Sequence, residues 1–246
     1  MLLVVVRAQV SVSGTTSIED STLGISRSEA VSSTEPGTNW DNLLRSSGRF
    51  LAVQHGFRLL TEPGSRKELT GPFVRDYLRS VGAMRRWSDS DPFIVNYVGH
   101  PLMGAVTGFL YLQNTGAGKD QRFEGSTEYW RLRLMAMTYS AVYSAQFEIG
   151  PVSEAAIGNV GRDHRTMGTV NLVVTPLAGT GWLVAEDIID RFVIDVLNAG
   201  PGSPMLRIPA RCLLNPGRTF AANLMQGRSP LLPHLTSPTR QQAQFQ

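Results

Sequence analysis

The chain has 246 residues, of which 42% are hydrophobic and 17% charged, and its formal net charge is +3. This length allows one large domain with a substantial core, and the low share of charged residues favours a globular helical or membrane-associated protein. The basic residues are scattered, which argues against nucleic-acid binding, and the single cysteine excludes an intramolecular disulfide and a multi-cysteine metal site.

The first 38 residues are predicted to lie outside the folded domain. Residues 2–6 are a short apolar run, and residues 6–8 resemble the cleavage site of a signal peptide whose basic start is missing. A strand-like or disordered N-terminus explains these residues equally well. Residues 11–38 are rich in Ser, Thr, Gly and Glu. We therefore expect a truncated signal or a disordered lead over residues 1–38.

Two helices are predicted before the central part of the chain. The first begins with Asn39 or Asp41 as its cap, contains His55, and is stopped by the Glu-Pro-Gly sequence at residues 62–64. The second is an amphipathic surface helix within residues 65–86, which an internal Gly-Pro pair breaks or restarts.

The central segment, residues 93–112, contains no charged side chain. Four polar or small residues recur at every fourth position along it: Asn96, His100, Gly104 and Gly108. On a helix they form one stripe, where glycines allow another helix to approach closely and the polar side chains can hydrogen-bond across the contact. Pro101 is expected to kink the helix. The stripe should meet another helix, with residues 127–149 and 171–185 as first candidates.

The remaining segments complete a predicted fold that is mainly α. A helix is expected over residues 127–149, and a second long apolar segment over residues 171–197 places Asp187 and Arg191 at the spacing of an i,i+4 ion pair. Prolines recur beyond residue 200, so only short helices are expected there. We predict a compact bundle of about four to six kinked helices over residues 39–200, followed by a Pro-rich tail over 201–246.

Membrane association can be judged from the lengths of the apolar segments. Residues 93–112 are long enough to cross a hydrocarbon core of ~30 Å, but Asn96, His100 and Pro101 make insertion costly without a partner helix. The uncharged part of the second segment, residues 171–185, is short for a span. These lengths favour a bundle partly or peripherally in the membrane, and a fully soluble bundle also remains open.

Two motifs suggest a relationship to a known family. Residues 96–101 read Asn-Tyr-Val-Gly-His-Pro, and residues 175–179 read Thr-Pro-Leu-Ala-Gly. With these motifs the chain resembles an uncharacterised bacterial family of cell-envelope proteins that carries Asn-Tyr-x-x-His-Pro and Thr-Pro-x-x-Gly in helical segments. The resemblance implies a helical fold and a location in the cell envelope, periplasmic or membrane-associated, but no activity.

The sequence leaves two interpretations of function open. The first is a structural or interaction protein at or in a membrane, with membrane lipid or an envelope protein as partner, because no complete catalytic signature is present. The second is an enzyme or a small-molecule or lipid binder with a pocket between kinked helices, centred on His100 as general base or proton carrier. Its other candidate residues are the possible helpers His55, Glu148 and Glu186 and the ligand-orienting Asn96 and Tyr97.

No cofactor is predicted. A metal site built from His55, His100 and Glu148 is a further idea, but these residues have no sequence-local signature of a metal site.

Overall fold

The computed structural model describes residues 37–61, 66, 72–82, 84–89, 91–119, 121–156, 168–199 and 204–226. Within these residues the chain is helical, and its only extended pairings are two isolated bridges, Thr38 with Thr115 and Arg86 with Gly168. The prediction of a mainly α protein is confirmed. The predicted lead lies outside the described residues, apart from positions 37 and 38.

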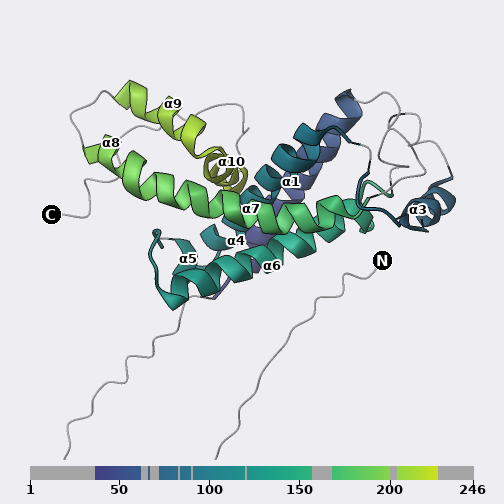
Figure 1. Cartoon of the computed structure of the whole chain (residues 1–246), viewed down its shortest axis with the longest axis horizontal. Coiled ribbons are helices and arrows are strands. Elements are labelled where there is room, and N and C mark those ends of the chain that lie inside the picture. The colour runs from purple at the N-terminus through teal and green to yellow at the C-terminus, as the bar shows by residue number, and fades with distance from the viewer. Residues whose placement is uncertain are drawn as a thin grey trace, which may run out of the picture. The chain divides into compact units, whose positions relative to one another are not determined.

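The bundle is built from three long helices around a shorter central one, with further helices at the sides (Figure 1). In chain order the elements are α1 (Trp40–Thr61), α3 (Phe73–Gly82), the π-helical turn η1 (Val95–Gly99), α4 (His100–Gln113), α5 (Gly116–Lys119), α6 (Thr127–Ile149), α7 (Val170–Ile189), the π-helical turn η2 (Asp190–Ile194), α8 (Asp195–Ala199), α9 (Pro204–Leu214) and α10 (Pro216–Met225).

Local capping residues set several of these boundaries. The backbone N–H of Asn42 donates to Oδ1 of Asn39 at 3.1 Å, so Asn39 caps α1. Ser126 caps α6 in the same way by accepting from the N–H of Tyr129 at 3.1 Å, and α6 has the predicted bounds. The described part of the predicted helix at 65–86 is shorter than expected, because α3 begins after Pro72 and ends at Gly82.

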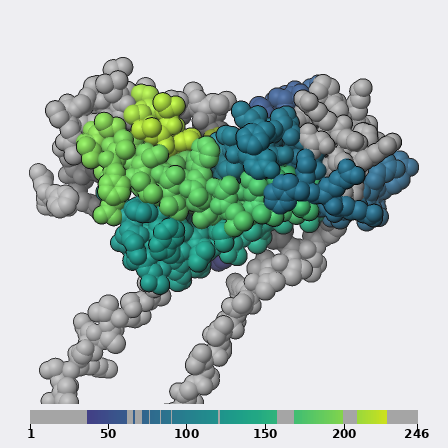
Figure 2. All heavy atoms as spheres, viewed as in Figure 1, coloured from purple at the N-terminus to yellow at the C-terminus, as the bar shows by residue number. Residues whose placement is uncertain are grey.

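Helix α4 is the core of the bundle. Every residue from Gly104 to Leu112 is buried, and α4 packs against α7, α6, α10 and α1. Protein therefore encloses this part of the central apolar segment. Its beginning is different, because residues 93–95 and 97–98 are exposed. Figure 2 shows the blue part of the chain that includes these residues at the surface beside the green of α7.

The predicted helix contact along the glycine stripe is confirmed. A Cβ added to Gly104 would lie 1.9 Å from the carbonyl oxygen of Thr175 in α7, and one added to Gly179 would lie 2.6 Å from the Cα of Gly104. A Cβ on Gly108 would lie 2.7 Å from Leu183, also in α7. The backbones of α4 and α7 approach so closely that only glycine fits at their crossing.

The irregularity expected at Pro101 takes the form of a π turn. Proline has no N–H to donate, and its ring collides with the carbonyl four residues earlier, that of Tyr97. The chain widens into η1 just before it, and the N–H of His100 donates to the carbonyl of Val95 five residues back. The wider turn accommodates the proline while α4 continues directly from it.

The predicted end of the helical domain at residue 200 is too early. Ala221 and Leu224 of α10 are buried in the same core as α4. The rings of Phe220 and Phe50 lie 5.6 Å apart, and a guanidinium nitrogen of Arg49 in α1 donates to the carbonyl of Leu224 at 2.8 Å. The prolines did not prevent these helices, because Pro216 occupies the first turn of α10, where its missing N–H is not needed.

Among the described residues, one continuous helical stretch, Val170–Asn198, is long and apolar enough to cross a membrane. Of its most apolar window, 39% is buried within the protein. A core helix of a soluble protein can meet the same criterion.

Candidate functional site

A buried carboxylate, Asp89, joins three segments of the chain. Its Oδ1 accepts from Nδ2 of Asn96 at 2.7 Å and from the N–H of Asp91 at 3.0 Å, and its Oδ2 accepts from Nδ2 of Asn171 at 2.7 Å. Asn96 lies in η1 and Asn171 in the first turn of α7. We call Asp89, Asn96, Asn171 and the neighbouring Glu148 the Asp89 cluster.

Backbone pairing brings Asp89 to the start of α7. The N–H groups of Thr169 and Val170 donate to the carbonyls of Arg86 and Trp87 at 2.9 and 3.0 Å. Gly168 is required at this junction, since a Cβ there would lie 2.5 Å from the backbone nitrogen of Asp89. A short stretch of extended chain thus carries the carboxylate between two helices.

Glu148 is the least satisfied member of the cluster. It is buried near the end of α6, and its Oε1 has no hydrogen-bond partner among the described residues. Burial raises the pKa of Glu148 well above its usual value, and the negative charges of Glu154 and Asp89 raise it further. Asn171 lies within hydrogen-bonding reach of Glu148, and its own Oδ1 has no described partner. The hydrogen bond from Asn171 and the charge of Arg58 act in the opposite direction and lower the pKa of Glu148.

The two histidines lie on either side of Phe147. The ring of His55 stacks on Phe147 at 5.2 Å, and the ring of His100 meets it edge-on at 6.5 Å. Nδ1 of His100 lies 3.2 Å from Oγ1 of Thr175 in α7, which is the predicted polar contact across the stripe. Burial lowers the pKa of His100 to about 4, although the charge of Asp89 acts in the opposite direction. Burial also lowers the pKa of His55, so both rings are neutral at pH 7.

The structure brings only some of the predicted site residues together. His100, Asn96 and Glu148 lie around Asp89, whose role the sequence did not reveal. The expectation that Asn96 bonds across to another helix is wrong, because its described partner is Asp89. Tyr97 is exposed instead of lining a site with His100. Within the described chain no group of three His, Cys, Asp or Glu side chains could hold a metal ion, so the idea of a metal site at His55, His100 and Glu148 finds no support.

Glu186 belongs to a different place, where it caps α10. Its Oε1 accepts from the N–H of Gly217 and from Nε1 of Trp182, both at 2.8 Å, and its Oε2 accepts from the N–H of Arg218 at 2.9 Å. Burial raises the pKa of Glu186, while these donors oppose the rise. A carboxylate at the positive end of a helix has a structural explanation.

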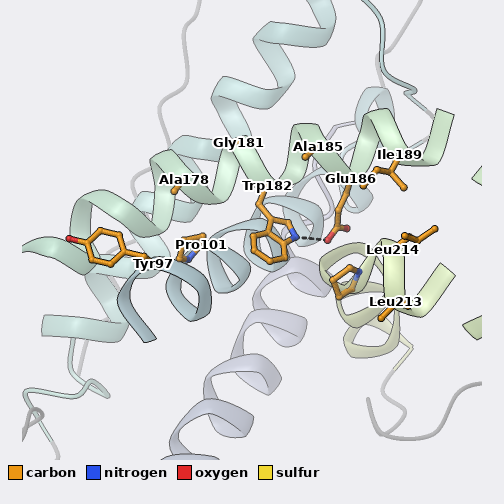
Figure 3. Close-up of a pocket in the computed structure, with 11 residues that line it drawn as sticks. Tyr97, Pro101, Ala178, Gly181, Trp182, Ala185, Glu186, Ile189, Leu213 and Leu214 are labelled. Carbon is orange, nitrogen blue, oxygen red and sulfur yellow. Dashed lines mark hydrogen bonds between the residues drawn. The ribbon is translucent and has the colours of Figure 1, made fainter. Parts of the chain in front are cut away.

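An open groove of about 450 Å³ runs past Trp182, and we call it the Trp182 groove (Figure 3). Tyr97 and Pro101 lie at one end, Leu213 and Leu214 lie at the other, and the indole of Trp182 stands between them. His100 does not line this groove. The groove lies beside the irregular helices, its walls are mainly apolar, and it is not the His100-centred pocket of the second interpretation.

Sequence reasoning also missed a buried charge cluster around Asp187. Oδ2 of Asp187 accepts from Nε and Nη2 of Arg133 at 2.9 and 2.7 Å and from the hydroxyl of Tyr129 at 2.8 Å. Oδ1 accepts from Arg218. The predicted pair of Asp187 with Arg191 is wrong, because Asp187 faces α6 and α10 while Arg191 donates to a backbone carbonyl. Helical spacing showed that a pair was possible but not which face is buried.

The geometry of the Asp89 cluster favours a structural role, in which it holds three segments of the chain together, over a catalytic one. The carboxylate of Asp89 is hydrogen-bonded through both oxygens, and His100 and Glu148 are buried. None of the three lines the Trp182 groove, so a substrate there would not meet them. Comparisons with protein-family models, curated proteins and solved structures found no match to this chain.

Proposed function

We propose that the chain is a non-catalytic protein of the bacterial cell envelope that attaches to a membrane surface through exposed aromatic side chains. One observation carries the proposal. Trp87, Phe93 and Tyr97 are 49%, 74% and 41% exposed, yet they contact one another. Nε1 of Trp87 donates to the hydroxyl of Tyr97 at 3.2 Å, and the rings of Phe93 and Tyr97 stack at 4.7 Å. We call these three residues the aromatic anchor.

The surroundings of the aromatic anchor fit a lipid interface. Ile94 and Val98, from the same stretch of chain, are also exposed, so apolar side chains extend the anchor. Arg85 and Arg86, directly before Trp87, are exposed and basic. Amphipathic aromatic rings beside arginines are typical of protein surfaces that rest at the level of lipid headgroups.

Helix α3 supports the same interpretation. Phe73, Val74 and Leu78 are exposed on one side of it, while Arg75 lies on another. The hydroxyl of Tyr77 donates to the carbonyl of Ile149 at 2.8 Å, which ties α3 to the end of α6. A short amphipathic helix that is held to α6 through Tyr77 and exposes Phe73, Val74 and Leu78 resembles an interfacial helix. The resemblance to a cell-envelope family supports a membrane as the partner.

Vesicle co-sedimentation of the full chain tests the proposal. Replacing Phe93 and Ile94 with Ser should weaken binding to vesicles that contain anionic lipid by about tenfold or more, because fully burying each side chain is worth about 1.5–3 kcal/mol. The matched control replaces two exposed apolar residues of α6, Leu134 and Val142, with Ser. If both double variants bind equally well, the aromatic anchor does not hold the membrane. Binding of the wild type to an envelope protein but not to vesicles would also contradict the proposal.

A second candidate function is the binding of an apolar molecule in the Trp182 groove. The favouring observation is that Tyr97 belongs to both the aromatic anchor and the groove wall, so the groove opens beside the anchor. Gly181 lines the groove, and a Cβ at this position would have no atom within 4 Å, so the side chain of Gly181→Leu can extend into the groove. This variant should lose affinity for a fluorescent fatty acid while still sedimenting with vesicles. Unchanged fatty-acid affinity would argue against the groove as a binding site.

A further inference from the structure

A second, polar pocket of about 280 Å³ lies where the α5–α6 loop meets α7 and α10, and we call it the loop pocket. Its walls come from segments far apart in the sequence: Lys119, Gln121, Arg122, Phe123, Asp187, Asp190, Arg191 and Arg218. It differs from the Trp182 groove in chemistry, because six of these eight side chains carry a formal charge. Neither function proposed above uses it.

The aspartates of the loop pocket are already bonded. Asp187 is buried between Arg133 and Arg218, so a single negative charge faces two positive ones. Oδ1 of Asp190 accepts from Nδ2 of Asn215 at 3.0 Å and pairs with Arg211 at 3.2 Å. Little negative charge is therefore left to neutralise further cations in this pocket.

Two cations of the loop pocket have no described carboxylate partner. The side-chain ammonium of Lys119 has no hydrogen bond or ion pair among the described residues, although its backbone N–H donates to the carbonyl of Thr115. Arg191 donates to the backbone carbonyl of Phe123, and its guanidinium lies 5.3 Å from the ring of Phe192. Asp120 adjoins Lys119 in the sequence but lies outside the described residues. In addition, Nε of Arg218 is buried and donates to no described atom. Buried donors without acceptors are rare in proteins and often mark a site for a missing partner.

We propose that the loop pocket binds a phosphate group, held by Lys119, Arg191 and Arg218. A planar guanidinium can present two parallel N–H donors to phosphate oxygens, and an ammonium adds a point charge, so arginine and lysine together are suited to a phosphate dianion. Asp187 holds Arg218 in place, while Phe123 and Phe192 hold Arg191, so two of the cations are positioned before the ligand arrives.

Either a soluble phosphate or a lipid headgroup could supply this group. Phe192 and Val196 are exposed beside Arg191 along the chain, and an acyl chain could lie against them. The phosphate chemistry is the same in both cases, so the experiment must separate the two sources. The loop pocket shares no lining residue with the aromatic anchor.

Calorimetry on the folded full chain with inorganic phosphate, and sedimentation with phosphatidylcholine vesicles with or without phosphatidic acid, test the site. Replacing Lys119 and Arg191 with Gln should weaken binding by about tenfold or more, because the variant loses two positive charges and their hydrogen bonds to the phosphate oxygens. Both residues are exposed, and thermal melting would check that the variant is folded. Arg45→Gln, an exposed arginine of α1, is the matched control and should change affinity less than twofold.

The outcomes separate the sources and can overturn the proposal. Binding of inorganic phosphate that the double variant loses supports the site for soluble ligands. Selective binding to phosphatidic acid vesicles, lost in the double variant, supports it for a lipid headgroup. No binding in either assay, or an equal loss in Arg45→Gln, overturns it. The variant with Ser at positions 93 and 94 should bind inorganic phosphate as the wild type does, so failure of the aromatic anchor can be told from failure of this site.

Discussion

Replacing Gly104 with Ala should separate α4 from α7 and lower the stability of the protein strongly. The new Cβ would lie 1.9 Å from the carbonyl oxygen of Thr175, 2.8 Å from its carbon and 3.0 Å from the Cα of Gly179. All three are backbone atoms of a packed helix, so no side chain can rotate away. The two helices would have to move apart by more than an ångström at the centre of the core.

The size of the effect follows from two opposing contributions. Overpacking in a core costs about 1–3 kcal/mol, and a clash with backbone belongs at the upper end or beyond. Alanine regains about 1 kcal/mol over glycine inside a helix. We expect a net loss of about 2–3 kcal/mol, which for a domain of this size lowers the melting temperature by about 5–10 °C. Circular dichroism melts and urea titrations of the purified chain would measure both values.

The matched control is Gly181→Ala in α7. No atom lies within 4 Å of a Cβ at that position, so the helix propensity of alanine should act alone and raise stability by about 0.5–1 kcal/mol. Gly179→Ala should behave like Gly104→Ala. Because the two methyl groups would push the same helices apart, the double variant should lose less than the sum of the single losses. The proposed crossing is refuted if alanine at positions 104 and 181 changes stability in the same direction.

Three further predictions concern the buried charges. The pKa of His100 is about 4 in the folded chain against 6.5 ordinarily, so its contribution to stability, about 3 kcal/mol in all, is present above pH 6.5 and is lost as the pH falls toward 4. His100→Gln should remove this loss from urea titrations run across that pH range. An unchanged pH dependence would contradict the prediction. The pKa of Glu148 is raised in the folded chain, so its contribution to stability is present below its ordinary pKa and is lost as the pH rises through its pKa in the folded state. Glu148→Gln should therefore be at least as stable as the wild type at pH 8. Marked destabilisation of this variant at pH 8 would mean that Glu148 is ionised and paired. Asp187→Asn leaves the guanidinium of Arg133, which is 1% exposed, without its anionic partner, and should lower the free energy of unfolding by about 3–5 kcal/mol. Asp195→Asn, in an exposed pair, should lower it by less than about 1 kcal/mol in the same urea titrations. Similar losses in the two variants would contradict this effect of burial.

The fold was largely predictable because local signals and tertiary packing agree in this chain. Ser126 and Asn39 act as caps where the sequence placed the starts of helices. The four-residue stripe correctly indicated a close helix contact, since only small residues permit backbones to approach. The boundary at residue 200 failed because proline counts do not reveal that Pro216 lies in a first turn, or that Phe220 of the same helix contacts Phe50.

The site was less predictable because its partners are joined by tertiary contacts. His100 and Glu148 were identified from residue type, but the carboxylate that organises them, Asp89, lies in a loop that looks like an ordinary turn. Asp187 was assigned a partner from its own helix, whereas its partners come from α6 and α10. The partner of a side chain such as Asp187 depends on which face of its helix is buried. This sequence contains no local signal that shows which face that is.

The contacts of α10 have a consequence for the order in which the protein can fold during synthesis. α10 completes the core between α1 and α4, but it ends at Met225, whereas α1 starts at Trp40. The pairing of Phe50 with Phe220 therefore joins the two ends of the domain, and such long-range contacts form slowly. A nascent chain would leave the side of α4 that α10 covers open until α10 is made. Until then, this surface is exposed to chaperones and to aggregation.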